Sequence, residues 1–190
     1  MYLHIYIYIY NHILFKQMKQ ALIDYIKRGT FDELYTPVEA IYPIIPYLKN
    51  KEYTTIWECT DYGESEITKV LRDSGFTVIT SHVKDKKSYF DYEPQENYDI
   101  IITNPPYSLK DEFLKRSYEL QKPFMLLLPI TTFEGIERGK MFRENGVEVL
   151  VFDRRINFMQ KQGKKGAWFN TSWFCNNVLD RQLIFHKLSI

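Results

Sequence analysis

The stretch Tyr98-Asp99-Ile100-Ile101-Ile102-Thr103-Asn104-Pro105-Pro106-Tyr107 decides the expected fold. Its run of three isoleucines is typical of a strand that is covered on both faces, as in a parallel sheet. Two consecutive prolines lack the backbone N–H that a sheet ladder needs, so the strand must end before them. Asn104 and Tyr107 are therefore expected at the carboxyl edge of the sheet, which is where open α/β sheets bind ligands.

The polar groups of this turn suit the recognition of an exocyclic amine. Asn104 offers a side-chain carbonyl, and Pro105 offers a backbone carbonyl on a segment that its ring holds rigid. Two converging acceptors can hold both hydrogens of an amine, and the ring of Tyr107 can stack on the base that carries it. The alternative is a strand-to-loop turn in which Pro105 and Pro106 only set the backbone geometry.

The sequence Asn104-Pro105-Pro106-Tyr107 after an apolar strand resembles the catalytic motif of amino-group methyltransferases that use S-adenosylmethionine (SAM), chiefly the N6-adenine DNA methyltransferases. The chain is similar to the small enzymes of this kind that phages and mobile elements encode, from about residue 31 to residue 178. The resemblance implies that these four residues are catalytic. It also implies a Rossmann-like SAM-dependent methyltransferase fold, an α/β fold with a mostly parallel sheet and helices on both faces.

The rest of the chain has the alternating pattern of such a sheet. Apolar segments predict strands at residues 54–58, 76–81, 124–128 and 147–152, and helical spacing predicts helices at 14–28, 38–48, 64–73, 109–120 and 133–145. Pro43 and Pro46 are expected to interrupt the second of these helices. Strands that alternate with helices predict a mostly parallel sheet with right-handed crossovers.

The resemblance also implies a cofactor site around the first strand. In these enzymes a Tyr-Thr-Pro segment upstream of that strand touches the methionine end of SAM, and Tyr35, Thr36 and Pro37 match it. Thr36 can also be read as a helix N-cap that is followed by proline at the first helical position. Both interpretations can hold together.

Four further residues match the cofactor positions of the family. Glu58 would hold the methionine ammonium, and Gly63 lies in the loop that follows it. His82 falls where an acidic residue usually binds the ribose hydroxyls, and Phe90 falls near the adenine position; a structural role is the alternative for His82. Tyr62 and Glu64 stand where the family has glycines, and this departure motivates a reading without SAM binding.

The carboxyl-terminal part is basic and aromatic. Residues 151–190 carry seven Lys or Arg and two Asp, a net charge of +5, although the whole chain carries only +1. We expect residues 153–178 to form a substrate-side segment in which lysines follow a phosphate backbone and aromatic rings stack on bases. The alternative is a hairpin loop beside buried aromatic residues. The predicted substrate-binding residues are Lys161, Lys164, Lys165, Trp168 and Asn170.

Length and composition limit the remaining possibilities. A chain of 190 residues with 45% hydrophobic residues predicts a single folded domain, 1–190, with residues 1–30 as an amino-terminal extension. The two cysteines have no metal-ligand spacing, so no metal site is expected, and a reduced cytoplasmic location in a bacterial or phage-infected cell is the default. No stretch reaches transmembrane length, so no membrane partner is expected.

The predicted function is methyl transfer from SAM to the N6 amine of adenine in nucleic acid, with DNA favoured over RNA. Only about forty residues follow the last expected core strand, which is little for reading several base pairs, so a protein partner or a homodimer is a further expectation. One alternative is a catalytically inactive, methyltransferase-like binding or inhibitory protein of phage or mobile-element origin. Another is a methyltransferase for a protein or small-molecule amine.

Overall fold

The structure is a computed structural model that describes residues 35–158 and 169–188. These residues all belong to one compact unit of the chain, Glu33–Ile190. The expected helix at 14–28, the amino-terminal extension, and Lys161, Lys164, Lys165 and Trp168 lie outside the described residues. No helix among the described residues is long and apolar enough to span a membrane.

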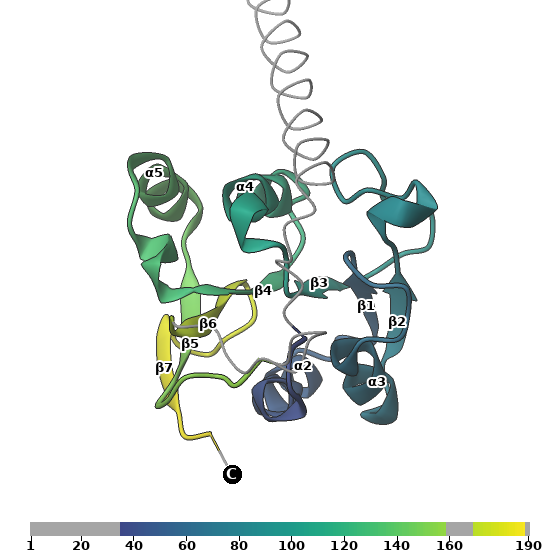
Figure 1. Ribbon diagram of the computed structural model, residues 1–190, viewed down its shortest axis with the longest axis horizontal. Coiled ribbons are helices and arrows are strands. Elements are labelled where there is room, and N and C mark those ends of the chain that lie inside the picture. Colours follow the sequence, from purple (N-terminus) through teal and green to yellow (C-terminus); the bar gives the residue numbers. More distant parts are fainter. Residues whose placement is uncertain (1–34, 159–168, 189–190) are drawn as a thin grey trace, which may run out of the picture. The chain divides into compact units, whose positions relative to one another are not determined.

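The described unit is built on one seven-stranded sheet with the strand order β2-β1-β3-β4-β6-β5-β7 (Figure 1). The pairs β1–β2, β1–β3, β3–β4 and β5–β7 are parallel, whereas β6 runs antiparallel to both β4 and β5. The strands are β1 (Thr55–Glu58), β2 (Thr77–Thr80), β3 (Ile100–Thr103), β4 (Phe124–Pro129), β5 (Glu148–Phe152), β6 (Thr171–Asn176) and β7 (Leu183–His186).

Helices cover both faces of this sheet. Helices α2 (Ile45–Asn50) and α3 (Glu66–Asp73) lie on one face, and α4 (Lys110–Glu119) and α5 (Ile136–Asn145) lie on the other (Figure 1). The short 3-10 helices are η1 (Val38–Ala40), η2 (Tyr42–Ile44), η3 (Val83–Asp85), η4 (Tyr107–Leu109) and η5 (Ile130–Phe133). A mostly parallel sheet between two helix layers confirms the predicted Rossmann-like α/β fold.

The core has an aliphatic side and an aromatic side. Ile44, Leu48 and Leu71 bring η2, α2 and α3 onto the sheet residues Ile56 and Ile100, and all five are fully buried. On the opposite face the contacts are between rings, with centroid distances of 5.2 Å for Trp57–Tyr98, 5.0 Å for Tyr118–Phe124 and 4.9 Å for Phe133–Phe174. Many of the chain's aromatic residues therefore fill the layer between the sheet and α4 and α5.

Most predicted elements are present, with shifts of a few residues at their ends. The strands expected at 54–58, 76–81, 124–128 and 147–152 correspond to β1, β2, β4 and β5. The expected helix at 38–48 is divided into η1, η2 and α2, because Pro43 and Pro46 cannot continue an α-helix. Strands β6 and β7 were not predicted; residues 171–176 of the expected substrate-side segment form a strand inside the sheet.

Candidate functional site

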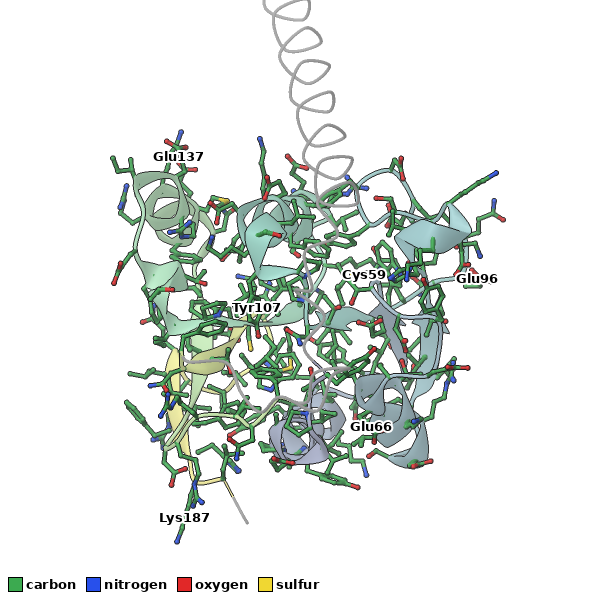
Figure 2. The ribbon with its side chains drawn as sticks, in the orientation of Figure 1. Cys59, Glu66, Glu96, Tyr107, Glu137 and Lys187 are labelled. Atoms are coloured by element: carbon green, nitrogen blue, oxygen red, sulfur yellow. The ribbon has the colours of Figure 1, made fainter. Side chains whose placement is uncertain are left out.

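The predicted catalytic turn and the predicted cofactor loop begin on neighbouring strands. Glu58 is the last residue of β1 and Thr103 is the last residue of β3, and these two strands pair in parallel. Strand β3 ends at Thr103 as expected, directly before Asn104 and the two prolines. In Figure 2, Cys59 and Tyr107, which follow β1 and β3, lie near the sheet between the helix layers. This is the carboxyl edge, where α/β sheets bind ligands.

A hydroxyl network holds the Glu58 carboxyl group. Thr103 donates from its hydroxyl to Glu58 Oε1 at 2.5 Å, and the Thr60 hydroxyl donates to the same oxygen at 3.0 Å. The backbone N–H of Thr60 donates to Glu58 Oε2 at 3.1 Å, and the two threonine hydroxyls lie 2.6 Å apart. Hydrogen bonds therefore connect Glu58 to its own loop and to the strand that precedes the predicted catalytic turn.

Burial dominates the electrostatics of Glu58, which is only 1% exposed. Burial raises the pKa of the Glu58 carboxyl to about 8, although the hydrogen bonds from Thr103 and Thr60 act in the opposite direction. The nearby Asp61 adds a further upward effect. Among the described residues no Lys or Arg forms an ion pair with Glu58. The site thus holds a buried acidic group with only neutral hydrogen-bond donors.

Asp61 organises the loop between β1 and α3. Its carboxylate accepts hydrogen bonds from the backbone N–H of Ser65 at 3.1 Å and from the hydroxyl of Thr68 at 2.6 Å. Ser65 is the N-cap of α3, and its hydroxyl accepts from the N–H of Thr68. Gly63 adopts a φ of +99°, which glycine allows without strain. Asp61 and Gly63 together shape the loop in which the cofactor was predicted.

The two aromatic residues at this edge stack on each other. Tyr62, 47% exposed, lies over His82 with ring centroids 4.0 Å apart, and Lys84 Nζ lies 5.5 Å from the Tyr62 centroid. His82 Nδ1 accepts a hydrogen bond from the Lys84 N–H, so the other ring nitrogen carries the proton in the neutral form. His82 is thus the N-cap of η3, which follows β2, and its ring also packs against Tyr62.

The structure brings Thr36 and Asn104 together. Asn104 Nδ2 donates to Thr36 Oγ1 at 3.0 Å, across 68 residues of sequence. The interpretation of Thr36 as a helix N-cap is wrong, because the residue before η1 is Pro37 and no side chain caps that helix. Tyr35, Thr36 and Pro37 are nevertheless at the predicted catalytic turn, with Tyr35 40% exposed and Thr36 buried.

Tyr107 follows Pro105 and Pro106 and is flanked by two phenylalanines from the carboxyl-terminal part. Its ring makes edge contacts with Phe169 at 5.4 Å and Phe158 at 6.5 Å between centroids. The exposed Asn170 lies beside the end of β4, since its carbonyl accepts from the Ile130 N–H at 2.9 Å. The chain on both sides of residues 159–168 therefore returns to the predicted catalytic turn.

Phe90 is placed differently from the other predicted cofactor residues. Its ring packs against Phe113 at 5.1 Å and Tyr89 at 5.9 Å between centroids, and the residue is only 6% exposed. Contacts with the aromatic core therefore bury most of the surface of Phe90. An adenine contact stays a prediction and is limited to this small exposed part.

Sequence reasoning missed four residues of the site: Thr60, Thr103, Phe158 and Phe169. The two threonines bind Glu58, and the two phenylalanines contact Tyr107. A threonine at the last position of a buried strand is the only sequence signal for Thr103, since its hydroxyl there needs a partner. No group of three metal-ligating side chains occurs within the described ranges.

Comparisons with known proteins do not place the chain in a family. No family model matches the sequence, and no curated protein matches it significantly. The structure is similar to an O-methyltransferase from Bacillus cereus in complex with S-adenosylhomocysteine, with a TM-score of 0.38 and 10% identity over 84% of this chain and 90% of that one. A proposed methyltransferase from Thermoplasma acidophilum gives a TM-score of 0.35 and 12% identity over 78% and 67%. These values are too low to support an inference about activity or substrate.

Proposed function

We propose that the protein transfers a methyl group from SAM to the N6 amine of adenine in nucleic acid, DNA rather than RNA. One observation carries this proposal: Glu58 ends β1, the Asn104 turn follows the neighbouring parallel strand β3, and the Thr103–Glu58 hydrogen bond joins the two. A cofactor group held near Glu58 and a base held at Asn104 would then be next to each other. Such proximity is the main requirement of a direct transfer.

The donor set around Glu58 suits the amino-acid end of SAM. A buried carboxyl group that is surrounded by neutral donors gains most from a bound cation, which favours its ionised form. The ammonium of the methionine part is such a cation. The pair of Tyr62 and His82 borders the same edge, and the exposed ring of Tyr62 offers an aromatic face toward the adenosine part.

The turn residues would orient the amine. Asn104 Oδ1 and the Pro105 carbonyl accept the two hydrogens of N6, so that its lone pair is directed at the incoming methyl. SAM supplies an electrophilic methyl group on a sulfonium. Neither an amide nor a proline carbonyl is basic enough to keep the proton that N6 loses, so that proton passes to water.

Tyr107 is the residue proposed to stack on the target base. The edge contacts with Phe158 and Phe169 fix the plane of its ring. A base in a duplex has to leave the helical stack to reach the edge of a sheet, and an aromatic face offsets part of the lost stacking. Pro106 fixes the backbone direction between Pro105 and Tyr107.

The nucleic-acid strand is proposed to follow the segment between Phe158 and Phe169, with Lys161, Lys164, Lys165, Trp168 and Asn170 as contacts. Support comes from its basic composition and from the two phenylalanines, at either end of the segment, that contact Tyr107. A protein partner or a second copy of the chain would extend this short surface. The proposed location is the cytoplasm of a bacterial or phage-infected cell.

One observation favours a second candidate function, that of an inactive methyltransferase-like binding protein. Tyr62 takes the place of a glycine and stacks on His82, so its side chain occupies the edge where a cofactor loop is normally small. Titration calorimetry with SAM and S-adenosylhomocysteine separates the two candidates. Micromolar binding supports the enzyme, and no binding at millimolar ligand contradicts it.

Replacement of Asn104 tests the catalytic assignment. Asn104→Ala removes one of the two acceptors for the amine, so we expect methyl transfer to an adenine-containing oligonucleotide to fall by about a thousandfold. Incorporation of labelled methyl from SAM measures this directly. Asn145→Ala, an exposed asparagine on α5, is the matched control and should retain full activity. Full activity of folded Asn104→Ala would contradict the assignment.

A further inference from the structure

The contact between Thr36 and Asn104 joins two segments that the sequence keeps far apart. Asn104 Nδ2 donates to Thr36 Oγ1 at 3.0 Å, and Thr36 is only 6% exposed. Loss of this partly buried hydrogen bond would leave the buried Thr36 hydroxyl without this partner, at a cost in free energy. In this structure the Thr36 hydroxyl accepts from the amide of the catalytic turn.

The segment that follows Thr36 is itself anchored in the core. The N–H of Ala40 donates to the Pro37 carbonyl at 3.0 Å and closes η1 directly after Thr36. The carbonyl of the fully buried Ala40 accepts from Trp173 Nε1 of β6 at 2.8 Å. The position of Thr36 thus depends on the central part of the sheet, and its hydroxyl has little freedom to move away from Asn104.

The two ends of the Asn104 amide have opposite roles. Oδ1 accepts hydrogen bonds and Nδ2 donates them, so only one of the two flipped orientations can receive the hydrogens of an amine. In the other orientation, Nδ2 would face the amine and place donor against donor. A threonine hydroxyl can donate as well as accept. In this structure Thr36 Oγ1 accepts from Nδ2, which is the orientation in which Oδ1 can accept from a bound amine.

We propose that Thr36 is a positioning residue of the methyl-transfer reaction: its hydroxyl holds Asn104 Nδ2, so that Oδ1 is presented to the substrate amine. This inference rests on the proposed function and assigns Thr36 a role different from the one that the resemblance implies. A residue that contacts the methionine end of SAM acts on cofactor affinity. A residue that orients Asn104 acts on the transfer step and leaves the affinity unchanged.

The first test separates these two roles by kinetics. Thr36→Val removes the hydroxyl at nearly constant volume, and we expect kcat to fall by about ten- to a hundredfold while the affinity for SAM stays within about threefold. Thr36→Ser should restore kcat, since it returns the acceptor. Thr132→Val is the matched control, because Thr132 is also fully buried and its hydroxyl has no partner among the described residues.

A carboxylate at position 104 provides the decisive comparison. Both oxygens of Asn104→Asp are acceptors, so no orientation has to be selected, and Thr36→Val should then change kcat by less than about threefold. If Thr36→Val lowers kcat equally in the protein with Asn104 and in the Asn104→Asp variant, the proposal is overturned. So would a loss of SAM affinity at unchanged kcat.

A readout without activity keeps the inference distinct from the proposed function. The side-chain NH₂ signals of Asn104, identified by their disappearance in Asn104→Asp, can be followed by nuclear magnetic resonance in the protein alone. Thr36→Val should shift these signals and speed the hydrogen exchange of the Nδ2 protons, whereas Thr132→Val should not. If wild-type protein transfers no methyl group, the proposed function fails. Unchanged Asn104 signals in Thr36→Val would overturn the positioning role in either case.

Discussion

At the scale of single residues, the most unusual group of the site is the Glu58 carboxyl. It is buried beside two threonine hydroxyls, and burial raises its pKa to about 8. The native state therefore keeps a proton on Glu58 under conditions in which the unfolded chain releases it. Because the native state binds more protons, the contribution of this group to stability is greatest at low pH and declines from its ordinary pKa of 4.5 up to about 8.

We therefore predict that Glu58→Gln removes a pH dependence of stability. Glutamine keeps the size of the side chain and is always uncharged, so the variant should gain stability relative to the wild type as the pH rises. The difference in the free energy of unfolding should change by up to about 1.4 kcal/mol per pH unit between about pH 5 and pH 8. Urea denaturation at a series of pH values measures this difference.

An exposed residue provides the matched control for this measurement. Glu137 points into solvent from the first turn of α5, so it lacks the burial that acts on Glu58 (Figure 2). The difference in the free energy of unfolding between Glu137→Gln and the wild type should not change comparably with pH. If the free energy of unfolding of Glu58→Gln changes with pH just as that of the wild type does over this pH range, Glu58 does not keep its proton in the native state.

The residue scale also shows where sequence reasoning stops. The strand end at Thr103 could be predicted, because two prolines cannot continue a sheet. The pairing of Asn104 with Thr36 could not, since it depends on where η1 packs on the sheet. Local preference even suggested a helix cap for Thr36. The contact of Thr103 with Glu58 likewise depends on the adjacency of β1 and β3.

At the scale of elements, the loop between β1 and α3 depends on Asp61. Burial alone would raise the pKa of Asp61, but hydrogen bonds from Thr68, Ser65 and the Glu64 N–H outweigh it and hold the pKa below its ordinary value. The ionised carboxylate therefore stabilises the first turn of α3 at neutral pH. This contribution is lost as the pH falls below the ordinary pKa of 3.8.

We predict that Asp61→Asn destabilises the protein by about 1–2 kcal/mol at neutral pH, because an amide accepts fewer hydrogen bonds than a carboxylate. The loss should disappear in acid. Asp73→Asn, at the exposed end of the same helix, should change the free energy of unfolding by less than about 0.5 kcal/mol. Equal losses in the two variants would show that the loop does not depend on Asp61.

The elements differ in how well the sequence predicts them. Strands β1 to β5 are apolar segments, and α-helices separate all of them except β2 and β3, so both their presence and their parallel direction could be predicted. Strand β6 could not, because it begins with Thr171 and Ser172, which are typical of surface loops but are buried here. Its reversed direction between β4 and β5 comes from long-range pairing and has no local signal.

At the scale of the whole molecule, the formal net charge of +1 gives little general attraction to nucleic acid. Binding of a phosphate backbone would then have to come from local groups of basic residues. The proposal places these groups in the segment with Lys161, Lys164 and Lys165, which lies outside the described residues. The salt dependence of binding tests this distribution of charge, because each neutralised phosphate releases counterions.

We predict that the combined replacement of Lys161, Lys164 and Lys165 by alanine lowers the magnitude of the slope of log K against log salt by about 2 to 3. Fluorescence anisotropy with a labelled oligonucleotide at several salt concentrations measures the slope. The control replaces Lys49, Lys51 and Lys69, which are exposed on α2, at its carboxyl end and on α3, and which change the net charge equally. Equal slopes for the two variants would contradict a local binding segment.

The reversed position of β6 has a consequence for how the chain becomes folded during synthesis. Strands β4 and β5 are made first, yet neither pairs with the other, because β6 lies between them. Until residues 171–176 have left the ribosome, the fully buried segment Phe124–Pro129 has an open edge. An unpaired apolar strand is prone to pair with other chains. Strand β6, which is made after both of its neighbours, therefore closes the gap between them, and a nascent chain that stalls before it is at risk of aggregation.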